Sequence, residues 1–203
     1  MHPHLVDIPL PWGGTLTIAS YGVMMMVGFL VCLYLLSRRG PALGLPLPSL
    51  FDIALAGLVG GIVGARLYYI IYAWEYFSAH PAHVFKIWEG GLVFYGGVMG
   101  GAAGVVLTTF LKELPFRRTI DVFTSLLPLG HAFGRVGCFF NGCCYGKPTE
   151  SFLGVKFPPE SAAYADMVRR GLLDPAASSK PPLDPTQLYA VAYNVLIFGV
   201  LSW

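Results

Sequence analysis

The segment 134–146 holds the side chains that are best suited to chemistry. It reads GRVGCFFNGCCYG and places a guanidinium, an amide and three thiols at the end of an apolar stretch. A charge at membrane depth is costly, so Arg135 is expected to face the protein interior and to act on something there. Arginine keeps its charge in any site and its planar fork matches a phosphate, which makes a phospholipid headgroup the first candidate ligand. The segment therefore indicates a membrane protein that handles an anionic lipid.

Composition supports the same class. The chain has 203 residues, of which 55% are hydrophobic and 12% are charged. A soluble domain averages about 25% charged residues, roughly twice as many. The net charge of +2 is too small to favour a nucleic-acid partner. These values predict a polytopic membrane protein in contact with the lipid bilayer.

Apolar stretches define the expected spans, each near the roughly 20 residues that a helix needs to cross a bilayer. They cover about residues 15–36, 50–73, 92–111, 119–140 and 185–203. The sequence therefore predicts an all-α, polytopic transmembrane helical bundle of about five spans, forming one domain over residues 1–203. The last span stops at Trp203 without a polar flank, so we expect later helices to be missing from this chain.

Basic residues predict the orientation. The loops after the first and third spans carry Arg38, Arg39, Lys112, Arg117 and Arg118, whereas the loop 74–91 between them carries only Lys86. Basic short loops stay on the cytoplasmic side. The N-terminus and the longer loop at about 147–184 are therefore predicted to be external.

Small residues recur four apart on two of the spans. The second span carries Gly57, Gly60, Gly61 and Gly64, and the third carries Gly96, Gly97, Gly100, Gly101 and Gly104. Such rows let helix backbones approach closely in a membrane, so helix packing is the expected role. The pairs Gly90-Gly91 and Gly96-Gly97 flank Tyr95, and an alternative is that they leave room for a substrate.

Four polar side chains within the apolar spans are candidates for a functional role: Tyr21, Arg66, Tyr95 and His131. Arg66 could snorkel, form a structural ion pair or bind an anion. His131 precedes Arg135 by four residues and so shares its helix face, where it could act as a base or simply hydrogen-bond. Buried tyrosines usually just find a partner for the hydroxyl.

The clustered thiols of Cys138, Cys143 and Cys144 allow three interpretations. A metal site is disfavoured because the C-x₄-C-C spacing lacks the usual ligand pairing and no histidine is adjacent. A disulfide is possible if the segment faces an oxidising exterior. Free thiols packed as small apolar groups are the expectation, with no metal.

Five blocks taken together resemble the prolipoprotein diacylglyceryl transferase family of bacterial inner membranes. They are SYGVM at 20–24, GARLYY at 64–69, WEGGLVFYGG at 88–97, the 134–146 segment and DPTQLY at 184–189. The third block is similar to the family's W-[DE]-G-G-x-x-[FY]-H-G-G, and the fourth to its signature G-R-x-G-N-F-x-N-G-E-x-x-G. The resemblance covers essentially the whole chain.

Several positions depart from the family pattern. Tyr95 stands where the third block has histidine, Cys138 and Cys143 stand where the signature has asparagine and glutamate, and Asp184 replaces the histidine of the last block. The family's C-terminal helices, which contribute another arginine, are missing. A divergent member is therefore expected.

The resemblance implies transfer of an sn-1,2-diacylglyceryl group from phosphatidylglycerol to the lipobox cysteine of a preprolipoprotein signal peptide, with release of glycerol phosphate. Arg135 would stabilise the leaving phosphate, Arg66 would be a second clamp, and Tyr95 or His131 would assist proton removal. The remaining substrate-binding residues would be Tyr21, Gly96, Gly97, Gly137, Asn141, Cys138 and Cys143. No cofactor or metal is implied, and the location is the bacterial inner membrane.

Two other functions remain open at this point. The same scaffold could bind or transport phospholipid without chemistry, because the family's histidine is replaced by Tyr95. Alternatively, the three clustered thiols could serve a membrane thiol-redox protein.

Overall fold

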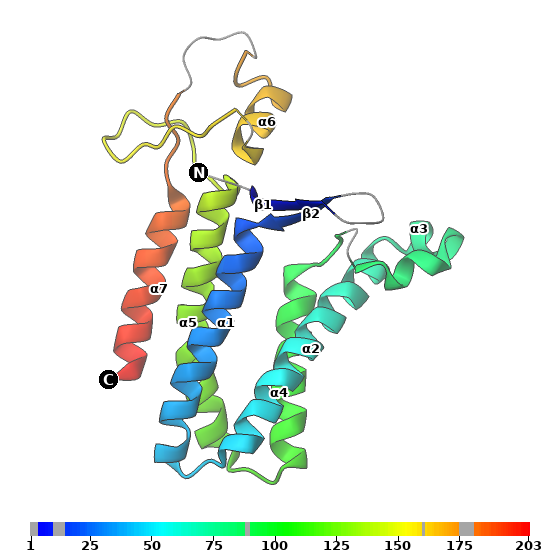
Figure 1. Cartoon of the computed structure of the whole chain (residues 1–203), viewed down its shortest axis with the longest axis vertical. Coiled ribbons are helices and arrows are strands. Elements are labelled where there is room, and N and C mark those ends of the chain that lie inside the picture. Colours follow the sequence, from blue (N-terminus) through cyan, green and yellow to red (C-terminus); the bar gives the residue numbers. More distant parts are fainter. Residues whose placement is uncertain (1–3, 10–14, 88–89, 160, 175–180) are drawn as a thin grey trace. The chain divides into compact units, whose positions relative to one another are not determined.

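The computed structural model describes residues 4–9, 15–87, 90–159, 161–174 and 181–203. The described residues form a helical chain with one short hairpin (Figure 1). Its elements are β1 (His4–Pro9), β2 (Thr15–Ala19), α1 (Ser20–Arg39), η1 (Pro41–Leu43), α2 (Leu47–Tyr72), α3 (Trp74–Ala79), η2 (Pro81–Phe85), α4 (Phe94–Leu111), α5 (Phe116–Asn141), α6 (Ala162–Arg169) and α7 (Thr186–Ser202). The predicted all-α fold is confirmed. One compact unit comprises Met1–Cys32 with Thr124–Trp203, and the other comprises Leu33–Phe123.

Three of the described helices are long and apolar enough to cross a membrane. They are α1 together with η1 (Ser20–Leu43), α2 and α4. The rest of the protein buries at most 17% of the apolar stretch of each helix. Large side chains such as Ile71, 74% exposed, are therefore left for lipid to cover. α7 is apolar but only 17 residues long, and α5 carries Arg117, Arg118 and Asp121 in its first turns. The number of five spans stays a prediction.

The start of the first predicted span is wrong. Thr15–Ala19 form strand β2, which pairs antiparallel with β1 so that Asp7 opposes Thr17. The β-branched Thr17 and Ile18 favour a strand over a helix, and the helix begins only at Ser20. Hydropathy alone did not separate these residues from the span that follows.

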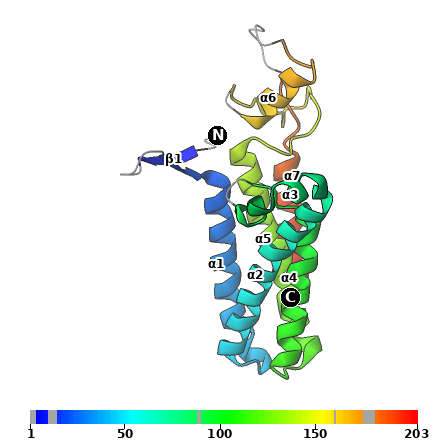
Figure 2. The ribbon, with the colours of Figure 1, turned by 90° about the vertical axis from the view of Figure 1, so that its right-hand side faces the viewer.

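Helices α2 and α4 pack along their glycine rows, and both views show them side by side (Figures 1 and 2). A Cβ atom built on Gly60 would lie 2.5 Å from the carbonyl oxygen of Gly100, and one on Gly64 would lie 2.4 Å from that of Gly96. No side chain fits at such separations, so the two backbones touch directly. The predicted packing role of these rows is confirmed.

The predicted external loop contains a small folded core. Helix α6 begins after Ser161, whose hydroxyl accepts a hydrogen bond from the backbone N–H of Tyr164. Buried apolar side chains gather around the helix, namely Phe157, Ala163, Met167, Leu173 and Leu183. Leu183 also forms backbone bridges to Pro148 and Val155, which tie the two ends of the segment together. The segment is therefore folded around side chains of its own.

Candidate functional site

The turn that follows α5 brings the thiols together. Gly142 has φ +68, its N–H bonds to the carbonyl of Phe139, and the N–H of Cys143 bonds to the carbonyl of Cys138. These two bonds define a Schellman motif, in which a glycine in the left-handed region reverses the chain over the last helical turn. The motif normally sets an apolar contact between the two residues that here are Cys138 and Cys143. Their side chains are thiols, so the turn pairs two sulfurs instead.

The Sγ atoms of Cys138, Cys143 and Cys144 all lie within 4.8 Å of one another. All four cysteines of the chain carry free thiols. A hydrogen bond from Cys138, reinforced by Asn141, Cys144 and the positive charge of Arg135, lowers the pKa of the Cys143 thiol against the opposing effect of burial. The free thiols agree with the expectation, and their role as apolar packing groups stays a prediction.

Contacts from distant segments hold this turn. The side-chain N–H of Gln187 donates to the carbonyl of Cys143 at 2.7 Å, and the hydroxyl of Thr186 donates to that of Cys144 at 2.8 Å. The N–H of Ala163 donates to the carbonyl of Gly142 at 2.8 Å. Cys144 itself has φ 57, a value that non-glycine residues rarely adopt. The first turn of α7 and the start of α6 thus fix the backbone that carries the thiols.

Two buried polar atoms in this unit have no hydrogen-bond partner within the described structure: Nε of Arg135 and Oε1 of Gln187. Arg135 precedes Cys138 by three residues on α5 and therefore shares its helix face. Leaving buried polar groups unpaired costs free energy, which favours a ligand that would satisfy them. The site therefore contains an unpaired N–H donor on the Arg135 guanidinium and an unpaired acceptor oxygen on the Gln187 amide.

The first turn of α1 lies against the same stretch of α5. A Cβ atom on Gly137 would lie 3.0 Å from Cδ2 of Tyr21 and 3.3 Å from Cβ of Met24. Tyr21 is 41% exposed, and Asn141 is the last residue of α5. The structure thus brings Tyr21, Gly137 and Asn141 to the same end of α5, where sequence reasoning expected a substrate to bind.

His131 lies one turn before Arg135 and contacts α7. Its Nδ1 lies 3.2 Å from Oδ1 of Asn194, whose Nδ2 donates to the carbonyl of Ala190 at 2.7 Å. Because the amide nitrogen is the donor to Ala190, the amide oxygen must accept from His131. The imidazole therefore carries its proton on Nδ1, and in the neutral ring Nε2 keeps a lone pair.

Arg66, in the other unit, has a different environment. Its five hydrogen bonds in the described structure are donated to backbone carbonyls. Nε donates to Val84 at 3.0 Å, Nη1 to Gly90 at 2.7 Å and Gly91 at 3.4 Å, and Nη2 to His83 and to Lys86 at 3.2 Å. The guanidinium also lies over the rings of Phe77 and Tyr69, at 5.2 and 5.8 Å from their centroids. An arginine has five N–H donors, so these carbonyls match its full capacity.

Glycine at residue 91 makes this cage possible. Gly91 has φ +75, and a Cβ atom there would lie 2.3 Å from Cε1 of Tyr69 and 3.0 Å from Nη1 of Arg66. Tyr95 follows on α4 and is 71% exposed. Gly96 and Gly97 belong to the glycine rows, with Gly96 pressed against the backbone of Gly64. In this unit the structure brings Arg66 and the loop before α4 together.

The chain matches the family model described as prolipoprotein diacylglyceryl transferase over residues 9–203. The chain belongs to the prolipoprotein diacylglyceryl transferase family. A relative from Clostridium tetani named phosphatidylglycerol–prolipoprotein diacylglyceryl transferase is 34% identical over 188 residues, which cover 93% of this chain and 70% of the relative.

Other relatives of the same name agree with this membership. The one from Symbiobacterium thermophilum is 35% identical over 93% of this chain and 66% of its own length. The one from Nitrosospira multiformis is 33% identical over the full chain and 65% of its own length. The chain thus spans about two thirds of the length of these relatives. The predictions of the family and of the transferase class are confirmed.

Within this diacylglyceryl transferase fold, sequence reasoning missed the residues that hold the site. Gln187 lies in the 184–189 block, and Asn194 lies two turns further along α7, yet neither was given a role. The signal for Gln187 was available, since it is an amide at the start of an apolar helix within a recognised block. Asn194 was detectable only as a polar residue inside the predicted fifth span.

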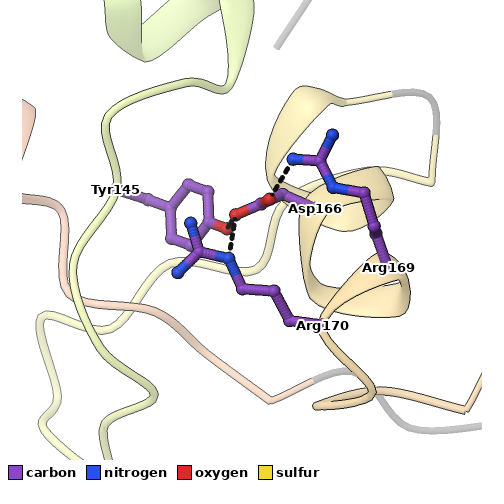
Figure 3. A network of polar contacts seen from close by, with 4 residues as sticks. All are labelled: Tyr145, Asp166, Arg169 and Arg170. Atoms are coloured by element: carbon purple, nitrogen blue, oxygen red, sulfur yellow. Dashed lines mark hydrogen bonds and ion pairs between the residues drawn. The ribbon is translucent and has the colours of Figure 1, made fainter.

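A polar cluster joins the loop after α5 to helix α6 (Figure 3). Asp166 on α6 accepts a hydrogen bond from the hydroxyl of Tyr145 and ion pairs from Arg169 and from Nε of Arg170, the latter at 2.9 Å. The Tyr145 hydrogen bond and Arg169 together hold the pKa of Asp166 down to about 2. Burial and the same hydrogen bond raise the pKa of Tyr145.

A cavity of about 410 Å³ lies next to this cluster. Its walls include Cys144, Tyr145, Lys147 and Arg170. Two of these side chains are cationic and one belongs to the thiol cluster. Cys144 therefore borders a cavity that two cationic side chains also line.

Proposed function

We propose that this chain transfers an sn-1,2-diacylglyceryl group from phosphatidylglycerol to the lipobox cysteine thiol of a preprolipoprotein. Membership of the family over residues 9–203 supports the reaction. The observation that carries the assignment to this site is Arg135, a cation within the signature segment whose buried Nε has no partner in the described structure. A phosphate oxygen is the acceptor that such a donor lacks.

In this reaction the sulfur of the substrate forms a bond to the glyceryl carbon while the carbon–oxygen bond to the phosphate breaks. The electron pair of the broken bond leaves with the phosphate oxygen, and the thiol proton passes to a base or to the phosphate. Charge therefore develops on the leaving glycerol phosphate. A preorganised guanidinium in a dry site stabilises that charge strongly, and Arg135 supplies it.

Proton removal is assigned to His131. Its Nδ1 donates to Asn194, which leaves the lone pair of Nε2 to accept a proton in the neutral ring. The hydrogen bond also fixes the tautomer, as the orienting partners of catalytic histidines do. Tyr95 is assigned a hydrogen bond to the phosphate, because a phenol donates more readily than it accepts a proton at neutral pH. Tyr21, Gly137 and Asn141 would line the substrate on α1 and α5.

Arg66 is assigned a positioning role in place of the predicted phosphate contact. Its donors are directed to carbonyls of the segment between α3 and α4, including those of Val84 and Gly90. A phosphate would have to displace several of these bonds. Arg66 therefore organises the loop that leads to Tyr95. Gly96 serves the packing of α2 against α4, whereas Gly97 has room beside it and keeps its proposed substrate role.

The substrates agree with the proposed location. Phosphatidylglycerol and a signal peptide both reside in a membrane, and the chain has at least three helices that can lie there. We assign the chain to the bacterial inner membrane as a multi-pass protein. The distribution of basic loops places the N-terminus and the α6 segment on the external side.

The direct test uses the full chain in nanodiscs that contain phosphatidylglycerol, with a synthetic lipobox peptide and detection of the thioether by mass spectrometry. We expect diacylglyceryl peptide and free glycerol phosphate in equal amounts. A matched peptide with serine in place of the lipobox cysteine is the control and should stay unmodified. Lipid binding without any thioether would refute the transferase and leave a lipid-binding module. Reversible oxidation of the clustered thiols without transfer would instead support a redox protein.

A further inference from the structure

We propose that Cys138, Cys143 and Cys144 bind a zinc ion whose fourth coordination position takes the thiol of the peptide substrate. The part of this inference that concerns the substrate rests on the proposed transferase function. The metal site itself rests on the geometry of the thiol cluster and on the polar groups around it. The spacing of the cysteines along the chain disfavours a metal, but the fold brings the sulfurs together.

The distances between the sulfurs suit a tetrahedral ion. Zinc–sulfur bonds of about 2.3 Å at tetrahedral angles place neighbouring sulfurs about 3.8 Å apart. The Sγ atoms of Cys138, Cys143 and Cys144 already lie within 4.8 Å of one another. Side-chain rotations that close these gaps by about 1 Å would complete the site. Three protein ligands with an open fourth position are the arrangement of catalytic zinc sites, whereas structural sites close all four.

The backbone that carries the ligands is held before any metal binds. The carbonyls of Cys143 and Cys144 accept hydrogen bonds from Gln187 and Thr186, respectively. Cys144 is kept at φ 57, an unfavourable value for a residue with a side chain. Strained residues persist where the surrounding contacts over-determine them, and they cluster at functional sites. The turn is thus built to present both thiols on the side of Cys138.

A second observation points to a ligand at this position. Gln187 is 0% exposed, its Nε2 donates to the Cys143 carbonyl, and its Oε1 has no partner within the described structure. A fully buried amide oxygen without a donor is costly. A peptide N–H beside the bound cysteine, or a water molecule on the metal, would supply that donor. The unpaired oxygen belongs to the same amide that holds the carbonyl of Cys143, one of the proposed ligands.

The charge balance also fits. Three thiolates and one divalent zinc ion carry a net charge of −1, and a fourth thiolate would make it −2. Arg135 shares a helix face with Cys138 and offsets that charge with a cation that cannot lose its proton. The same guanidinium is the one assigned to the leaving phosphate.

Access to the site is provided by the cavity of about 410 Å³, which Cys144 lines together with Lys147 and Arg170. A peptide segment that enters from the external side would reach Cys144 first. Soft thiolate ligands select zinc over the magnesium and calcium ions that prefer oxygen. An incoming cysteine is a ligand of the same kind as the three that hold the metal.

The chemistry that zinc would supply is activation of the substrate thiol. Only the thiolate is nucleophilic, and a free thiol is mostly protonated at neutral pH. On coordination the substrate thiol would pass its proton to His131, the base assigned above, and the sulfur would stay nucleophilic as a thiolate. Its lone pair then forms the bond to the glyceryl carbon, and the electron pair of the carbon–oxygen bond leaves with the phosphate. No electrons are exchanged with an oxidant or reductant.

The metal site can be tested without measuring activity. The full chain is purified in detergent, stripped with a chelator under reducing conditions and titrated with Co²⁺, whose thiolate charge-transfer and ligand-field bands report sulfur ligation and tetrahedral geometry. We expect one tightly bound ion per chain that Zn²⁺ displaces. Cys138→Ser, Cys143→Ser and Cys144→Ser should each weaken binding at least tenfold. Cys32→Ser is the matched control, because Cys32 donates to the Leu126 carbonyl outside the cluster.

Two results would overturn the metal site. One is the absence of thiolate bands with Co²⁺ in a protein that is monodisperse and whose thiols all react with a thiol reagent. The other is a quantitative disulfide among the three cysteines in a peptide map of unreduced protein. Equal binding by the wild type and all three cluster variants would also refute the assignment.

A second measurement separates this inference from the transferase assignment. Addition of the lipobox peptide should shift the Co²⁺ bands, and a peptide with serine in place of cysteine should not. If the bands shift but no thioether forms in nanodiscs, the site for a substrate thiol stands and the transferase reaction fails. If thioether forms at the same rate in metal-free and zinc-loaded protein, the transferase stands and the role of zinc fails.

Discussion

Alanine at Gly100 should strongly destabilise the packing of α2 against α4, whereas alanine at Gly97 should not. A Cβ atom on Gly100 would lie 2.2 Å from the carbonyl oxygen of Gly60 and 2.8 Å from Cα of Gly64. A Cβ atom on Gly97 would lie 3.6 Å from both the Cβ atom of Ala65 and the carbonyl oxygen of Gly61, which is ordinary van der Waals contact. The two glycines lie on the same helix, three residues apart.

Comparison of the Gly100→Ala and Gly97→Ala variants isolates the free-energy cost of overpacking at the contact between α2 and α4. Replacing glycine by alanine in a helix gains about 1 kcal/mol from helix propensity, and this gain is common to both variants. Overpacking costs about 1–3 kcal/mol, and the upper end applies at Gly100 because the obstacle is backbone that cannot change rotamer. A domain of this size loses roughly 2–4 °C in Tm per kcal/mol, so the two variants should differ by about 6–12 °C.

The assay is thermal unfolding of the two purified variants in the same detergent, followed by intrinsic fluorescence, with the wild type as reference. Gly97→Ala should match or slightly exceed the wild type. Equal Tm values for Gly100→Ala and Gly97→Ala would refute the direct backbone contact between α2 and α4. Gly97→Ala also tests the predicted substrate role of that residue, because unchanged stability with a raised KM for phosphatidylglycerol would favour it.

Substitutions at three further positions test the site and the α6 segment. Arg135→Lys should reduce thioether formation nearly as much as Arg135→Ala, because an ammonium cannot make the planar two-point contact with phosphate; retention of most activity by the lysine variant would refute that contact. Arg66→Lys should expose η2 to limited proteolysis, because the three N–H donors of lysine cannot replace the five of arginine at the same carbonyls. If η2 stays protected and only the KM for phosphatidylglycerol rises, Arg66 contacts the headgroup instead. Because the pKa of Asp166 is lowered from 3.8 to about 2, its stabilisation of α6 is present above about pH 4 and lost as the pH falls towards 2. Hydrogen-exchange protection of α6 should fall across that window in the wild type, and a fall of the same size in Asp166→Asn would contradict the assignment.

Local sequence composition was sufficient to predict the fold class, one helix–helix contact and the family of this protein. The apolar spans, the scarcity of charge and the glycine rows predicted a helical membrane protein, because burial in lipid imposes its demands on each span separately. Close helix contact through Gly60 and Gly64 was equally predictable, since small residues recur on one face whatever their partner is. The ordered blocks around Arg135 predicted the family. The residues 15–19 were assigned wrongly because hydropathy measures apolarity and not the backbone preference of Thr17 and Ile18.

The tertiary structure alone decided what surrounds the reactive groups. Gln187 and Thr186 reach the carbonyls of Cys143 and Cys144 from 44 and 42 residues away, and no local pattern encodes a contact at that separation. Gly142 turns the chain so that Cys143 faces Cys138, an arrangement that the spacing of the cysteines alone does not reveal.

The surroundings of Arg66 were decided in the same way. The sequence marked Arg66 as a charge that needed partners inside the membrane, but it could not say that those partners are carbonyls 17 to 25 residues away. Charge and hydropathy belong to single residues and can be read along the chain. Whether a buried donor is satisfied or left open to a ligand depends on groups that only folding brings within hydrogen-bond distance.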